Sequence, residues 1–136
     1  MRVFLDTNVL AYSADQTDIV KNGKAISIVQ SALKRKSEFA ISVQVLTEFC
    51  NVALRKLSMP QDSVLDFLRM FRKIETVLPD ADLVVRGVEI RTRYGIQYYD
   101  SLMIAAAERI GAAEIWTEDL ADGQTYCGVK AVNPFK

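Results

Sequence analysis

The 136-residue chain carries 17 Lys and Arg residues against 17 Asp and Glu, contains no His, and is half hydrophobic. This size and balance are typical of a single globular domain spanning residues 1–136, and the zero net charge excludes a generally basic polyanion-binding protein. No apolar run approaches the ~18 residues that a membrane span requires, and the short apolar N-terminus does not resemble a secretory signal. We therefore expect a cytoplasmic protein without membrane contact.

The absence of histidine restricts the possible chemistry more than any other count. It excludes Ser-His-Asp and Cys-His catalysis, as well as histidine-based metal sites such as HExxH. If the chain is an enzyme, its chemistry depends on carboxylates, lysines, tyrosines or a metal ion.

In the first half of the chain, short apolar runs alternate with helical periodicities. A buried run ends at Asp6, where Thr7 and Asn8 interrupt the apolar residues. Ser42 is placed to cap a later helix, and Pro60 suits the first turn of the next one. The patterns predict strands at 2–6, 39–41 and 74–78, and helices at 7–14, 19–36, 43–57 and from Pro60 to Phe71.

In the second half, a helix begins at Asp80 and ends near Gly95, a residue that often terminates helices. The stretch YYDSLMIAAAERIGA predicts a helix that is apolar almost all round between Leu102 and Ala107, and therefore buried on several sides. Strands are predicted at EIWT and VKAV, with a loop at EDLADGQ between them. This alternation favours an α/β fold with a central parallel sheet.

Acidic residues fall where such a fold builds its sites, because open parallel sheets form them at the carboxyl ends of strands. Asp6 and Asp119 each follow a predicted strand, and Asp100 lies at the entry to the buried helix. N-capping explains Asp6 and Asp100 equally well, and turn chemistry is the commoner role for an aspartate in a loop like that of Asp119. Glu48 lies nearly opposite the apolar stripe of its helix, where a solvated glutamate is the default.

Taken together, these acids point to a metal ion, because several bare carboxylates at one sheet edge repel one another and have raised pKa values. A set of oxygen ligands without histidine suits Mg²⁺ or Mn²⁺ better than zinc. The matching reaction is phosphodiester hydrolysis by metal-activated water.

Three stretches in register resemble PIN-domain nucleases, and in particular the VapC-like ribonuclease toxins of bacteria. FLDTNVLAY is similar to the opening of that family, AISVQVLTEFCNV to its second segment, and YYDSLMIAAAERIGAAEIWTEDLADGQ to its carboxyl-terminal half. The resemblance covers essentially the whole chain. It implies a three-layer α/β/α sandwich around a parallel sheet of four to five strands.

The resemblance also implies a Mg²⁺-dependent endoribonuclease that cleaves single-stranded RNA, with Mn²⁺ as a substitute ion. Asp6, Glu48, Asp100 and Asp119 match the family's acidic quartet, with Glu118 and Asp122 as alternatives to Asp119. It further implies a homodimer and a cognate antitoxin protein. Thr7, Asn8 and Thr117 match the polar residues that support the quartet.

Two alternative functions are distinguishable from the nuclease. An aspartyl-phosphate hydrolase needs a second aspartate two residues after the first, a position that Asn8 occupies here. A catalytically silent PIN-like module that binds RNA or protein would be expected to lose some of the four acids, yet all four positions are filled. Basic residues that are candidate phosphate contacts, although a solvated helix face is the commoner role for most of them, are Arg55, Lys56, Arg69, Arg72, Lys73, Arg91 and Arg93.

Overall fold

A computed structural model describes all residues from 1 to 136. A six-stranded sheet runs through the molecule in the order β3-β2-β1-β4-β6-β5, so β1 lies at its centre. All neighbouring strands are parallel except the last pair, β5 and β6. The strands are β1 Val3–Leu5, β2 Phe39–Ser42, β3 Glu75–Val77, β4 Glu114–Trp116, β5 Thr125–Tyr126 and β6 Val129–Val132.

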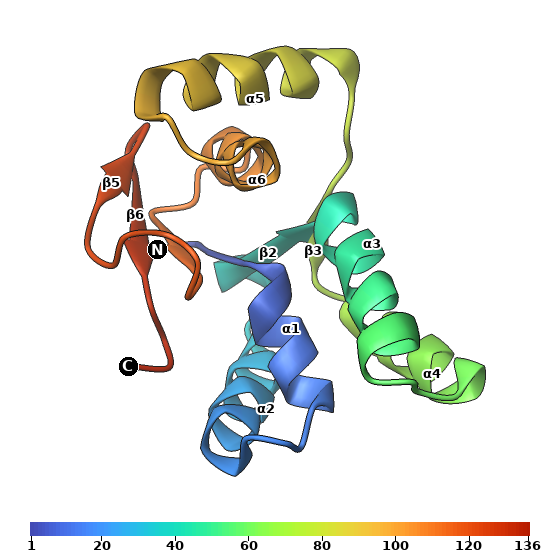
Figure 1. Ribbon diagram of the computed structural model, residues 1–136. Coiled ribbons are helices and arrows are strands. Elements are labelled where there is room, and N and C mark those ends of the chain that lie inside the picture. Colours follow the sequence, from blue (N-terminus) through green and yellow to red (C-terminus); the bar gives the residue numbers. More distant parts are fainter.

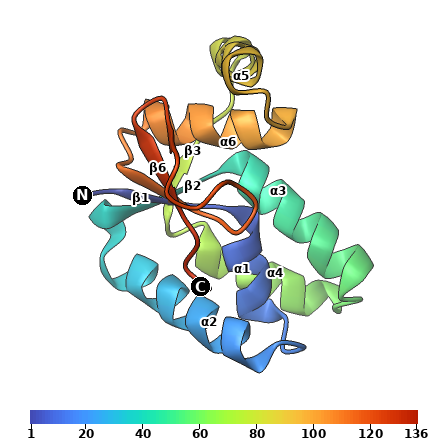
Figure 2. The same cartoon turned by 60° about the vertical axis from the view of Figure 1, so that its left-hand side comes forward.

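Helices cover both faces of this sheet (Figures 1 and 2). On one side α6 packs on the sheet and α5 lies outside it, whereas α1 to α4 lie on the other side. None of these helices is long and apolar enough to cross a membrane. The helices are α1 Thr7–Ala14, α2 Ile19–Lys34, α3 Val43–Asn51, α4 Gln61–Phe71, α5 Ala81–Tyr94 and α6 Tyr98–Arg109, with a 3₁₀ turn η1 at Lys36–Glu38 and a π-helical turn η2 at Val52–Lys56.

The architecture confirms the predicted α/β fold with a central, mostly parallel sheet between helical layers. The sheet has one strand more than the predicted maximum of five, because the two-residue β5 forms an antiparallel hairpin with β6. A strand of two residues has no periodicity that a sequence pattern could reveal. The predicted helix over 43–57 ends as a regular α-helix at Asn51 and continues as a π-helical turn.

Several local predictions have a clear structural basis. The Asp80 side chain accepts a hydrogen bond from Leu83 N and caps α5, and Gly95 ends that helix in the left-handed conformation at φ 65°. The Ser42 hydroxyl caps α3 by accepting from Val45 N. These caps satisfy backbone groups that the ends of a helix would otherwise leave unpaired.

The parallel pairing of β1 with β4 decides where the chemistry lies. Leu5 is in register with Trp116, and the Asp6 N–H donates to the Trp116 carbonyl at 3.1 Å. The first residues beyond both strands, Asp6 and Thr117, therefore lie side by side at the carboxyl edge of the sheet. Both are buried, with 3% and 1% of their surface exposed.

Candidate active site

A cavity of about 350 Å³ opens at this carboxyl edge. Its floor comes from the turn after β1, and its walls come from α1, α3, the beginning of α6 and the loop after β4. All four acidic residues selected from the sequence line it. The full lining is Asp6, Thr7, Asn8, Ala11, Tyr12, Asp15, Glu48, Asn51, Val52, Lys56, Gln97, Asp100, Met103, Glu118 and Asp119.

Asp6 is both the cap of a helix and the most buried acid of the cavity. One carboxylate oxygen accepts a 2.6 Å hydrogen bond from the Thr7 N–H at the start of α1. The other accepts from the Thr117 hydroxyl at 2.6 Å. The pKa of Asp6 is raised to about 7, mainly by burial and in smaller part by the charges of Asp119 and Asp100, although these two hydrogen bonds act to lower it.

Glu48 lies on the second turn of α3 and faces Asp6 across Thr7. Its carboxylate accepts from the Thr7 hydroxyl at 3.1 Å and from the Gln44 side-chain amide at 3.4 Å. Burial raises the pKa of Glu48 despite these hydrogen bonds, and the charge of Asp119 adds to the effect. The helical pattern alone places this glutamate in solvent, and the structure instead gives it a half-buried position in the cavity wall.

Asp100 is the third residue of α6, so the interpretation of it as an N-cap is wrong. The cap position belongs to Gln97, whose side chain makes no capping hydrogen bond. Asp100 lies within the first turn, where the positive end of the helix dipole favours a carboxylate. Burial nevertheless raises the pKa of Asp100 to about 6, and the charges of Asp119 and Glu48 contribute to the rise.

Of the three acids after β4, only Asp119 joins the other carboxylates without a cation of its own. Its carboxylate accepts a 3.2 Å hydrogen bond from the Asn8 amide, and its N–H donates to the Thr117 hydroxyl. Glu118 also lines the cavity, but it is bonded to Tyr12 at 2.5 Å and to Lys21 at 3.0 Å. Asp122 lies outside the lining and binds the Asn133 N–H and Lys136.

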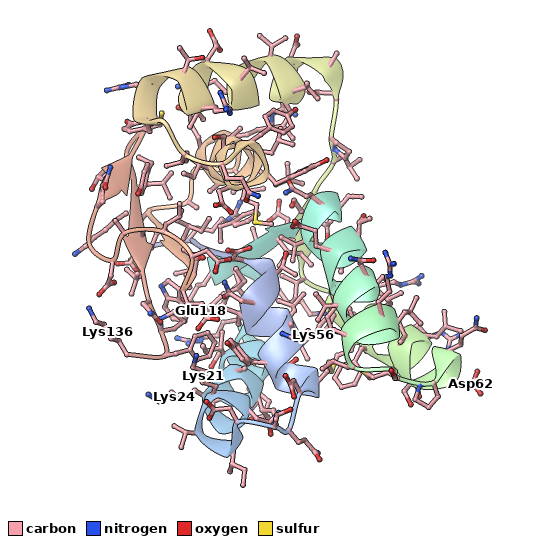
Figure 3. The ribbon with its side chains drawn as sticks, viewed as in Figure 1. Lys21, Lys24, Lys56, Asp62, Glu118 and Lys136 are labelled. Atoms are coloured by element: carbon pink, nitrogen blue, oxygen red, sulfur yellow. The ribbon has the colours of Figure 1, made fainter.

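Three residues in or beside the cavity are not predicted from the sequence as part of the site: Tyr12 lines it, and Lys21 and Gln44 bond acids of its lining. Tyr12 and Lys21 hold Glu118 at one end of the cavity, and Lys21 and Glu118 lie close together in Figure 3. Tyr12 and Lys21 are about a hundred residues from Glu118 in the sequence, so no local pattern predicts that they bond it. Gln44, on α3 one turn before Glu48, could have been found as an i, i+4 partner of that glutamate.

The four acids Asp6, Glu48, Asp100 and Asp119 share one electrostatic property, since none of them forms a salt bridge with a Lys or Arg residue. A carboxylate without a positive partner is costly where it is buried, as Asp6 is, or partly buried, as Glu48 and Asp100 are. The amide oxygen of Asn8 is also buried in this cavity and accepts no hydrogen bond. The cavity therefore gathers oxygen ligands that lack a positive partner.

This donor set fits a hydrated hard cation better than a closed protein cage. No three acidic or cysteine side chains are arranged as a ready-made metal site. Mg²⁺ usually keeps several waters and binds one or two carboxylates together with substrate oxygens. An oxygen-only set without histidine or thiolate is also a poor zinc site.

A larger cavity of about 460 Å³ lies on the other side of α3, between that helix, α5 and α6. Its walls are mainly apolar, and Glu48 is the only one of the four acids among them. A candidate active site is marked by several titratable groups with perturbed pKa values in one cavity, and only the smaller cavity brings Asp6, Glu48 and Asp100 together. The smaller, acidic cavity is therefore the candidate active site.

Fold and site together define an α/β protein with an acidic cavity at the carboxyl edge of its parallel sheet. The chain belongs to the PIN domain family, whose profile matches residues 3–121. No curated protein matches the chain in sequence.

Solved structures similar to this chain include a toxin and several toxin–antitoxin complexes. VapC20 of Mycobacterium tuberculosis, described as a sarcin-ricin loop cleaving toxin, has a TM-score of 0.68 and 17% identity over 86% of this chain and 89% of its own. DNA-bound VapBC of Salmonella typhimurium has a TM-score of 0.69 and 19% identity over 96% of both chains. A toxin–antitoxin complex of Klebsiella pneumoniae has a TM-score of 0.65 and 21% identity over 98% of both chains. At these identities the likeness shows the fold.

Proposed function

We propose that the protein is a Mg²⁺- or Mn²⁺-dependent endoribonuclease that cleaves single-stranded RNA. The observation that carries the proposal is the convergence of Asp6, Glu48, Asp100 and Asp119 in one cavity with no Lys or Arg partner. Membership of the PIN domain family supports it, as does the fold shared with a toxin described as cleaving the sarcin-ricin loop.

In this proposal Asp6, Glu48 and Asp100 hold the ion, directly or through water, and Asp119 supports it or a second ion. A bound Mg²⁺ or Mn²⁺ ion would supply water activation and charge stabilisation for hydrolysis of a phosphodiester bond. Thr117 and the Thr7 N–H fix the Asp6 carboxylate from two sides. Such fixed orientation keeps a charged ligand in place without reorganisation during the reaction.

The network around Asp6 links three of the acids through two polar side chains. The Thr7 hydroxyl bonds Glu48, and the Asn8 amide reaches Asp6 at 3.4 Å and Asp119 at 3.2 Å. In the proposed enzyme, Thr7 and Asn8 therefore position carboxylates and do not react themselves.

We further propose that the protein is the toxin of a toxin–antitoxin pair, that it acts as a homodimer, and that a cognate antitoxin blocks its site. The fold shared with VapBC of Salmonella typhimurium and with the Klebsiella pneumoniae complex supports an antitoxin partner. Expression of the chain alone should stop bacterial growth, and Asp6→Asn should relieve the arrest. Relief by a small DNA-binding protein encoded next to it would identify the antitoxin.

Cleavage of single-stranded RNA by the purified chain in Mn²⁺ or Mg²⁺ tests the ribonuclease function. We expect cleavage that stops on addition of EDTA, returns with excess Mn²⁺, and is lost in Asp6→Asn and Asp100→Asn. Asp122→Asn is the matched control, because it removes an acid of the same region that lies outside the cavity. It should cleave like the wild type.

Two results would overturn the ribonuclease function. The first is a folded wild-type chain that cleaves no single-stranded RNA with either ion, which would favour the silent RNA- or protein-binding module. The second is an Asp6→Asn or Asp100→Asn variant that cleaves as fast as the wild type.

A further inference from the structure

The acidic cavity contains a single cation, Lys56, among its fifteen lining residues. The other basic residues named as candidate phosphate contacts lie outside this lining, and Arg69 pairs with Asp66. The structure therefore reduces a long set of basic candidates to one residue at the proposed site.

Lys56 reaches the cavity because the helix that carries it changes its winding. It is the last residue of the π-helical turn η2, which follows α3 without a break. One extra residue in a turn rotates everything beyond it by about 100° around the helix axis, compared with a continuous α-helix. In Figure 3 the Lys56 side chain points from this segment toward α1, whose residues form the opposite wall. Turns of this kind occur frequently at functional sites.

The Lys56 ammonium has no partner within the protein, since no hydrogen bond or salt bridge involves it. Asp15, the acid at the same end of the cavity, is bonded instead to the N–H and hydroxyl of Thr17. Those bonds are the main cause of its lowered pKa, to which the charge of Lys56 adds. Lys56 thus keeps its hydrogen-bond donors available for an anion.

Lys56 lies at the end of the cavity toward which both α3–η2 and α1 lead from the acids. Glu48 and Lys56 are on the same helical segment, eight residues or about two turns apart. The helix α1 leads the same way, from the turn at Asp6 to Asp15. A phosphate bound at Lys56 would therefore lie farther along the cavity than a phosphate at the proposed metal site between the acids.

We propose that Lys56 binds a phosphate of single-stranded RNA next to the one that is cleaved, so that the strand runs between α1 and α3–η2. The inference rests on the proposed ribonuclease function. Lys56 then acts as a positioning residue, because it holds the strand and touches none of the reacting atoms. Its loss should raise KM and leave kcat nearly unchanged.

RNA binding at several salt concentrations tests this role, with a fluorescein-labelled, sequence-randomised single-stranded RNA and the cleavage-inactive Asp100→Asn chain. Loss of one phosphate contact should lower the salt slope of log Kd by about 0.7 for a single strand. If the variant and the parent chain bind equally at 1 M salt, this change in slope makes the variant bind roughly fourfold more weakly at 0.15 M salt. Lys56→Ala should show this change, and Lys56→Arg should restore both values.

Arg55→Ala is the matched control, because it removes the same charge from the same turn at a residue that does not line the cavity. It should leave the slope within error of the parent chain. A scan with one RNA of defined sequence, in which the wild-type chain's cleavage position has been mapped and one linkage at a time is a neutral methylphosphonate, then locates the contact. One linkage beside the cleaved position should weaken binding to the parent chain and have no further effect on Lys56→Ala.

Equal slopes for Lys56→Ala and the parent chain would overturn the proposal, as would equal losses for Lys56→Ala and Arg55→Ala. The proposal would also fail if, at every linkage, the loss of RNA affinity caused by the methylphosphonate and the loss caused by Lys56→Ala were independent and additive. Each of these results can occur in a chain whose wild type cleaves RNA with Mn²⁺. Failure of the inference is therefore distinguishable from failure of the proposed function.

Discussion

Replacement of Asp6 by asparagine should make the folded chain more stable at neutral pH and abolish its cleavage activity. The reason is the raised pKa of the Asp6 carboxyl, about 7 in the fold against an ordinary 3.8. Below about pH 4 this carboxyl is protonated in both the folded and the unfolded chain, so its burial is least costly there. As pH rises toward and through 7, the folded state must either keep the proton or bury a charge, and the stability is lost.

The pKa difference sets the size of the effect. A shift from 3.8 to about 7 corresponds to roughly 4 kcal/mol when complete. The part of this loss that falls between pH 5 and pH 8 is about 3 kcal/mol. Asp6 is 3% exposed, so solvent screening reduces this value little.

Urea unfolding at pH 5 and pH 8 in EDTA measures the difference. The wild type should lose stability over this interval, and Asp6→Asn should lose about 3 kcal/mol less. Asp100 titrates in the same interval in both chains, so its contribution largely cancels in the comparison. Addition of Mg²⁺ at pH 8 should raise the stability of the wild type more than that of the variant, because the ion binds only the folded carboxylates. Equal losses in the two chains would refute the reasoning.

Two further perturbations test the surroundings of Asp6. Asp119→Asn should lower the cleavage rate roughly 10- to 100-fold, the scale for a residue that supports a metal ligand. Glu118→Gln breaks the pair with Lys21, should lower the free energy of unfolding by about 1 kcal/mol or less, and should cleave almost like the wild type. A large loss of cleavage in Glu118→Gln with little loss in Asp119→Asn would instead make Glu118 the fourth acid. Thr117→Val should destabilise the fold by about 1–3 kcal/mol in urea at pH 8, because it removes the hydroxyl that donates at 2.6 Å to one oxygen of the buried Asp6 carboxylate. It should also raise the pKa of Asp6, so the pH-dependent loss of stability should extend to higher pH, and an unchanged pH profile would contradict this role.

The fold and the position of Asp6 can be predicted from the sequence because both depend on local signals. The apolar run before Asp6 forms β1, and the polar residues after it begin α1, where Asp6 serves as the cap. Capping and membership of the acidic cavity are compatible, because the two oxygens of the carboxylate have different partners. The alternatives weighed for this residue therefore do not exclude each other.

Other parts of the site could not be predicted from local pattern. Glu48 is half-buried because α1 packs against α3, a tertiary contact that the helical periodicity does not contain. The distinction between Asp119 and Glu118 depends on which of them Lys21 reaches from α2. The direction of Lys56 depends on a π-helical turn in a stretch that reads as continuous helix.

The strand order has a consequence for when the site can exist during synthesis. Its four acids come from residues 6, 48, 100 and 119, and the central strand β1 acquires its neighbour β4 only after most of the chain has been made. A ribosome-bound chain that ends before Thr117 lacks the hydroxyl that fixes Asp6 as well as the last carboxylate. If this protein cleaves RNA, a nascent chain is therefore inactive until β4, Thr117 and Asp119 have joined β1, and this pairing is the step that creates the site.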